Sequence, residues 1–220
     1  VVDIEGRCLL PGLIDAHNHF LSTGESLASI DARSLDRTTG EFLFDKLRHA
    51  AIDTPPGGTI TAYGLDPDKL TDGEINRWKL DSVVPDHRVV IYHVSGHGAV
   101  ANSAILTDAG IDRTTPDPLG GWFTRDSSGE PNGWCFDAAL SAIVPVAVEV
   151  GAHGPNFHTR GSRQELAAAV LRAQFAYLAA GLTTVCDAQV TSRELSTYAQ
   201  LHQRGQLRIR TVCMPLSHQI

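Results

Sequence analysis

Two helix–strand units near the end of the chain limit its possible folds more than any other feature. Ser162 and Thr191 are each followed three residues later by a glutamate, a pattern in which a hydroxyl and a carboxylate close the first turn of a helix. Alternating helices and strands of this kind form parallel α/β folds. The predicted elements are a helix over 163–180, a strand over 182–187, a helix between Thr191 and Gly205, and a strand over 207–214.

A short strand near the start of the chain carries the strongest candidate for chemistry. Residues 13–19 (LIDAHNH) follow a Pro-Gly pair and are predicted to form a buried strand of a parallel sheet. Alternate residues of a strand face the same way, so Asp15, His17 and His19 should share one face. Two imidazoles at the carboxyl end of a strand can bind one metal ion, which makes His17 and His19 candidate ligands. The alternative is a polar pair at a solvent-facing strand end.

The long stretch between these segments, residues 21–158, is irregular and rich in turn residues. Its strands, helices and hairpin predict a compact α+β insertion that follows the first strand. The predicted elements are strands over 59–64 and 88–94, helices over 75–80 and 102–109, and a hairpin of 121–125 with 133–136. Thr71 and Glu74 are expected to form the capping box of the helix over 75–80.

Five segments, spread in order over the chain, carry a resemblance to a known family. They are Gly6-Arg7 with LPGLIDAHNH (10–19), HGAVANSAIL (97–106), DPLGG (117–121), DSSGEPNG (126–133) and GLTTVCD (181–187). Together they are similar to the amidohydrolase superfamily, and within it to the third amidohydrolase family, the group that contains N-substituted formamide deformylases. The resemblance covers essentially the whole chain.

The resemblance implies an α/β fold, a partial TIM (β/α)₈ barrel of the metal-dependent hydrolase type with an α+β insertion after its first strand. Residues 1–20 would form the end of a flanking β-sandwich and the first barrel strand, 21–158 the insertion, and 159–220 helix–strand units of the barrel. Because a complete barrel takes about 250 residues, the chain is expected to be truncated at both ends and inactive alone.

The resemblance also implies the chemistry. A divalent metal, in the first instance one or two Zn²⁺ ions, would activate a water for attack on an amide-type carbonyl carbon of a small molecule. His17 and His19 match the first two ligands of the family. The remaining ligands and the catalytic base are expected downstream of Ile220, so no catalytic residue is assigned here.

Other candidate residues keep two interpretations. Asp15 either orients a metal-binding histidine by accepting a hydrogen bond from it, or is a structural carboxylate at the strand end. His97 either contacts substrate, as the resemblance suggests for a segment that reaches over the barrel mouth, or only bonds a loop carbonyl. Asn102 is expected to cap the helix that follows it. Asp187 is expected to anchor a loop rather than to act in catalysis.

Composition excludes several classes of protein. The net charge is −7 and no Lys/Arg-rich run occurs, which argues against a nucleic-acid surface. No apolar run is long enough to cross a bilayer, so no membrane partner is expected. The four cysteines form no C-x-x-C pair and predict reduced core thiols. A cytoplasmic protein is the default expectation, and an export signal upstream of Val1 stays open. An incomplete barrel would leave strand edges and apolar faces uncovered, so the isolated chain is expected either to aggregate or to pair with itself as a homo-oligomer.

Three functional hypotheses remain. The first is a metal-dependent hydrolase that cleaves C–N bonds of amides. The second is a deaminase on the same scaffold, because activated water can also attack an amidine carbon. The third is a non-catalytic regulatory or binding protein with a degenerate metal site, against which the intact H-x-H pair argues.

Overall fold

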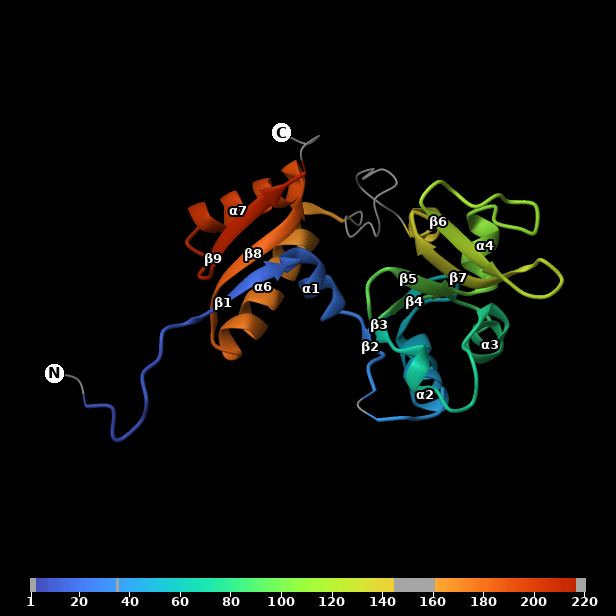
Figure 1. Cartoon of the computed structure of the whole chain (residues 1–220), viewed down its shortest axis with the longest axis horizontal. Helices are drawn as coiled ribbons and strands as arrows, with labels where there is room; N and C mark the ends of the chain where they lie inside the picture. Colours follow the sequence, from blue (N-terminus) through green and yellow to red (C-terminus); the bar gives the residue numbers. More distant parts are fainter. Residues whose placement is uncertain (1–2, 35, 145–160, 217–220) are drawn as a thin grey trace. The chain divides into compact units, whose positions relative to one another are not determined.

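The computed structural model describes residues 3–34, 36–144 and 161–216 and divides the chain into two compact units. Residues 1–27 and 161–220 form one, named here the terminal unit, and residues 28–160 form the other, the central unit (Figure 1). The predicted insertion was expected to begin at residue 21, whereas the first helix, α1 (Phe20–Ser26), packs against a helix of the terminal unit. The expected end of the insertion at residue 158 lies outside the described residues.

The terminal unit is built on a parallel sheet of three strands in the order β1-β8-β9. The strands are β1 (Leu13–Asn18), β8 (Leu182–Val190) and β9 (Arg210–Pro215). The helix α1 follows β1, α6 (Arg163–Ala179) leads into β8, and α7 (Ser192–Gln203) connects β8 to β9. The parallel α/β prediction is therefore confirmed. Within the described residues this sheet is open and residues 3–12 form no strand, so the closed barrel and the flanking β-sandwich stay predictions.

Local sequence signals explain where the helices of the terminal unit start. Ser162 Oγ accepts a hydrogen bond from the Glu165 amide, and the Glu165 carboxylate accepts one from the Ser162 amide at 2.7 Å. Thr191 and Glu194 close α7 in the same reciprocal way. Gly181, at φ +85°, provides the left-handed residue that turns α6 into β8. The two capping boxes predicted for the terminal unit are confirmed.

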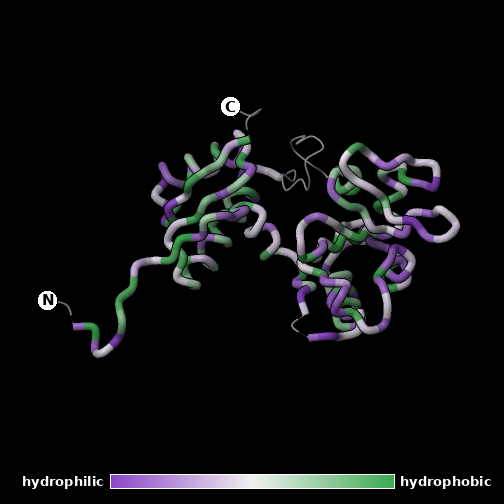
Figure 2. The backbone as a smooth tube through the Cα atoms, viewed as in Figure 1, coloured by the Kyte–Doolittle hydropathy of each residue, from purple (hydrophilic) through white to green (hydrophobic). Residues whose placement is uncertain are grey.

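Apolar residues of the terminal unit divide into a buried set and an exposed set. Phe20, Val170 and Val185 are fully buried between the helices and the sheet. On the approach to β1 and along this edge strand, Leu10 and Ile14 are instead 73% and 69% exposed. Figure 2 shows the same hydrophobic run leading into β1. The edge of the sheet at β1 therefore presents an apolar surface.

The central unit holds a six-stranded mixed sheet in the order β2-β3-β4-β5-β7-β6. Its α+β character confirms the prediction, and its two hydrophobic clusters lie on opposite faces of β4, with Ile91 in one and Val90 in the other. Its elements are β2 (Ile30–Asp31), α2 (Glu41–Asp53), β3 (Thr59–Leu65), the 3₁₀ turn η1 (Pro67–Lys69), α3 (Arg77–Val83), β4 (Arg88–His93), β5 (Gly98–Ala101), α4 (Ser103–Asp108), β6 (Gly121–Arg125), β7 (Pro131–Asp137) and α5 (Leu140–Ile143).

One helix start in the central unit was predicted wrongly. A capping box of Thr71 and Glu74 was expected to open a helix at residue 75, but α3 begins at Arg77. Asn76 is the true cap, because its side-chain oxygen accepts a hydrogen bond from the Lys79 amide at 3.0 Å. The Thr71 hydroxyl donates to the Thr38 carbonyl instead.

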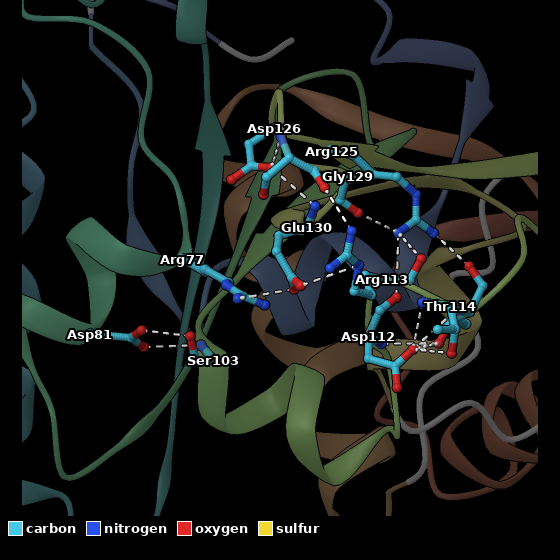
Figure 3. Close-up of polar contacts among 12 residues, drawn as sticks. Arg77, Asp81, Ser103, Asp112, Arg113, Thr114, Arg125, Asp126, Gly129 and Glu130 are labelled. Atoms are coloured by element: carbon cyan, nitrogen blue, oxygen red, sulfur yellow. Dashed lines mark hydrogen bonds and ion pairs between the residues drawn. The ribbon is translucent and has the colours of Figure 1, made fainter.

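Polar contacts hold the β6–β7 hairpin to the rest of the central unit (Figure 3). Glu130, in the connection between these strands, lies 3.8 Å from Arg77 and 4.0 Å from Arg113. Arg125 donates to the main-chain carbonyls of Asp112 and Thr115 in the loop after α4, and to that of Gly129 within the hairpin at 3.1 Å. These contacts join α3, the loop after α4 and the hairpin, so the predicted hairpin is confirmed and its position fixed.

The four cysteines are all free, and only one of them is a core residue. Cys135 of β7 is 1% exposed, whereas Cys8 is exposed and the other two are half-buried. The expectation of core thiols is therefore right for Cys135 and wrong for Cys8, which precedes the first strand and contacts no core. In the part of the chain that the structure describes, no helix is both long and apolar enough to span a bilayer.

Burial of Cys135 predicts a pH dependence of stability. Burial raises the pKa of this thiol to about 12, against an ordinary value near 9.0. A raised pKa means that the folded state keeps the proton more tightly, so the contribution is fully present below pH 9 and lost as pH rises towards 12. At pH 10 we expect the free energy of unfolding of the wild type to have lost about 1 kcal/mol more than that of Cys135→Ala. Urea unfolding of both proteins at pH 7 and pH 10 measures the difference; identical pH dependence would contradict the prediction.

Candidate metal centre

The two candidate ligands lie together at the carboxyl end of β1. Their ring centroids are 5.4 Å apart and the rings are nearly perpendicular, at 88°. Only His17 belongs to the strand: His19 follows it and is the N-cap residue of α1. The predicted strand over 13–19 thus ends one residue early, at Asn18, and its pairing with β8 is irregular between Asp15 and Asn18. The two imidazoles are nevertheless neighbours.

A main-chain contact selects the tautomer of His19. Its Nδ1 atom lies 3.3 Å from the carbonyl oxygen of Ala188 in β8. A carbonyl oxygen only accepts, so this hydrogen bond requires the proton on Nδ1. The lone pair of the neutral ring is then on Nε2, the atom that would bind a metal ion. His17 is exposed at the strand end.

Asp15 acts on the chain between the two histidines. One carboxylate oxygen accepts from the side-chain amide of Asn18 at 2.6 Å, and the other accepts from the main-chain amide of His17 at 3.2 Å. The other side of the Asn18 amide accepts from the Tyr177 hydroxyl at 2.6 Å. Asp15 therefore fixes the strand end through Asn18, and a bond from Asp15 to an imidazole stays a prediction.

A second carboxylate, Asp187, lies buried behind His19 and is 3% exposed. It accepts from the Phe20 amide at 2.9 Å and from the Tyr198 hydroxyl. Burial, with the carboxylate nearby, raises the pKa of Tyr198 above its ordinary range. The same two causes raise the pKa of the Cys213 thiol, opposite Asp187 in β9, to about 11. Asp187 thus joins α1, β8 and α7, which confirms its expected role as an anchor.

The chemistry of these donors fits part of a metal site. Two neutral imidazoles are good ligands for zinc and other divalent transition metals, and a catalytic zinc takes three protein ligands. Among the described residues no group of three or more His, Cys, Asp or Glu side chains could hold a metal ion. His17 and His19 therefore fit the first two positions of such a site, with further donors required.

The other two candidates lie in the central unit. His97 is exposed, and its Nδ1 atom lies 2.7 Å from a carboxylate oxygen of Asp137. The imidazole of His97 is therefore held by a carboxylate and not by a loop carbonyl, as the structural alternative had expected. A contact of His97 with substrate stays a prediction. Asn102 is 1% exposed and caps α4 by accepting from the Ile105 amide. Its structural role is confirmed.

A model of the amidohydrolase family matches residues 1–220, the entire chain. The chain belongs to the amidohydrolase family. This confirms the resemblance inferred from the five segments. Among curated proteins it is similar to N-substituted formamide deformylase of Arthrobacter pascens, with 29% identity over 210 residues that make up 94% of this chain and 37% of that protein. It is also similar to Protein LONG AFTER FAR-RED 3 of Arabidopsis thaliana, with 34% identity over 188 residues, or 84% and 30% of the two chains.

The fold of this amidohydrolase chain is shared with solved structures. An uncharacterized metal-dependent hydrolase from Pyrococcus horikoshii matches with a TM-score of 0.61 at 23% identity, over 93% of this chain and 36% of that one. The chain spans about a third of the length of these relatives, between 30% and 37%. The likeness to the solved structure shows the fold, a mixed α/β architecture.

Sequence reasoning missed the aromatic residues that support the site. Phe20 stacks between Tyr177 at 5.5 Å and Tyr198 at 5.6 Å, measured between ring centroids. Tyr177 lies in the helix predicted over 163–180, which gives its hydroxyl no partner by itself. The three rings come from α1, α6 and α7, and no local pattern links them. An inward-facing tyrosine on each of two successive helices is the one signal that points to buried hydroxyl contacts.

Asn102 provides a test of the structural assignment in the HGAVANSAIL segment. Besides capping α4, its side chain accepts from the Val89 amide at 3.1 Å and donates to the His87 carbonyl at 2.8 Å. Asn102→Ala would leave these buried groups unsatisfied, so we expect a loss of about 3 kcal/mol in the free energy of unfolding. Asn76→Ala removes a half-buried cap and should cost about 1 kcal/mol. Chemical denaturation measures both; equal costs would contradict the bridging role.

Proposed function

We propose that this chain supplies the first two ligands of a divalent metal centre, in the first instance zinc, in a hydrolase that cleaves a C–N bond of a small amide-type molecule. The observation that carries the proposal is the pair of adjacent imidazoles, His17 and His19, at the carboxyl end of β1. Membership of the amidohydrolase family supports it. So does the name of the Arthrobacter relative, a formamide deformylase.

The bound metal would supply a Lewis acid and an activated water for attack on a carbonyl carbon. The residues of this chain would hold and orient the metal ion. His19 would bind through Nε2 because the Ala188 carbonyl keeps the proton on Nδ1. Asn18 and Asp15 fix the main chain between the two ligands, which limits the movement of both rings.

The metal content of the full-length protein tests the proposal. We expect one or two ions per wild-type chain by elemental analysis, and at least about tenfold less in the double variant His17→Ala/His19→Ala, because most ligand donors to the first ion are lost. His202→Ala, which removes an exposed imidazole from α7 in the same unit, is the matched control and should keep its metal. Equal metal in the double variant and the wild type would place the site elsewhere.

A deaminase on the same scaffold is the alternative reaction, and the products distinguish the two. Hydrolysis of an N-substituted formamide releases formate and an amine, whereas hydrolysis of an amidine group releases ammonia. A non-catalytic role is the third possibility. It is retained because the name of the Arabidopsis relative states no reaction. Wild-type protein that retains metal but hydrolyses neither substrate class would favour that role.

A further inference from the structure

We infer that Asp187 is a positioning residue for the metal ligand His19, which it acts on through the main-chain amide of Phe20. The inference rests on the proposed metal centre. Asp187 lies in β8, and the two residues that it holds come from other elements: Phe20 begins α1 and Tyr198 lies in the middle of α7. A carboxylate distant in sequence thus determines where the chain turns directly after His19.

The start of α1 explains why such a residue is required. A helix leaves its first amides without partners, and a Ser, Thr, Asp or Asn at the N-cap position normally accepts from them. Here the N-cap position is occupied by His19, whose side chain makes no capping hydrogen bond. Asp187 accepts from the amide of the first helical residue instead, at 2.9 Å. One of the unpartnered amides at the start of α1 is thus satisfied from β8, while the N-cap position carries an imidazole.

The surroundings of Phe20 make this contact rigid. The Phe20 ring is fully buried and stacked against Tyr198, with 19° between the ring planes. Packing therefore fixes the ring of Phe20 while Asp187 fixes its amide. The Tyr198 hydroxyl donates to the second oxygen of the same carboxylate. Any rotation of the His19–Phe20 peptide would break the amide contact and tilt a ring in a closed stack. The imidazole of His19 therefore has a fixed main chain on its carboxyl side.

Burial of Asp187 argues that its position is specific. Removing a carboxylate from water is costly unless hydrogen bonds compensate, and this one is 3% exposed. A surface carboxylate could provide a mere loop contact at far lower cost. At this position one oxygen accepts from the amide that directly follows His19, and the other accepts from the hydroxyl of Tyr198, whose ring packs on Phe20. The arrangement matches the outer contacts of metal ligands, whose loss weakens metal binding without removing a ligand.

Cobalt binding to the full-length apoprotein, followed by visible absorption, tests the inference without an activity assay. Asp187→Ala should weaken Co²⁺ binding by about ten- to a hundredfold. Asp187→Asn keeps an oxygen that can accept from the Phe20 amide, so its affinity should stay within about threefold of the wild type. Val185→Ala, fully buried in the same strand, is the control for lost stability and should also stay within about threefold.

The outcomes separate the inference from the proposed function. If Asp187→Ala binds cobalt as tightly as the wild type, or Val185→Ala and Asp187→Asn weaken binding as much as it does, the positioning role is overturned and the metal site stands. If the wild type binds no cobalt, or His17→Ala/His19→Ala binds it equally, the proposed centre fails and the inference with it. Should Asp187→Ala fail to fold, Asp187→Leu fills the same site without an oxygen that can accept from the Phe20 amide, and an unchanged affinity in that variant would overturn the role.

Discussion

The pairing of β1 with β8 is the constraint on which the rest of the structure depends. Leu13 pairs with Leu182 and Asn18 with Asp187, so the strand that carries the histidines is held by a strand from the far end of the chain. Closing so long a loop is tolerable because its entropic cost grows only slowly with length. The central unit inside the loop has its own sheet and its own hydrophobic clusters, so it is folded structure rather than a flexible linker.

Elements with local signals could be predicted from the sequence, and those without them could not. The capping boxes at Ser162 and Thr191 lie within four residues of sequence, and the helices that they open were predicted correctly. The helix α2 was missed because its N-cap is Gly40, which has no side chain, and the Gly40 amide bonds to Asp72 from a distant loop. The strand β5 (GAVA) was missed because it is buried along its whole length and shows no alternation.

The candidate site divides in the same way. The H-x-H pattern predicted the neighbouring imidazoles because two residues on one strand have a fixed spacing. It could not predict the irregular pairing between Asp15 and Asn18, nor the stack of Phe20 between two tyrosines, because both depend on elements about 160 residues away. Asp187 was recognised as an anchor from its place at a strand end, but its partners, an amide of α1 and a hydroxyl of α7, come from tertiary contacts alone.

Aspartates that cap a helix from a distance recur in this fold, and the comparison shows what is particular to α1. The carboxylate of Asp72 accepts from the Gly40 amide at the start of α2, and that of Asp81 accepts from the Ser103 amide of α4. At α4 the local cap Asn102 is also present, so Asp81 adds to a start that is already defined. At α1 the side chain of the N-cap residue His19 makes no capping hydrogen bond, so Asp187 supplies the acceptor for the first helical amide. The long-range contact therefore matters most at α1, where the N-cap residue is a histidine that makes no capping hydrogen bond.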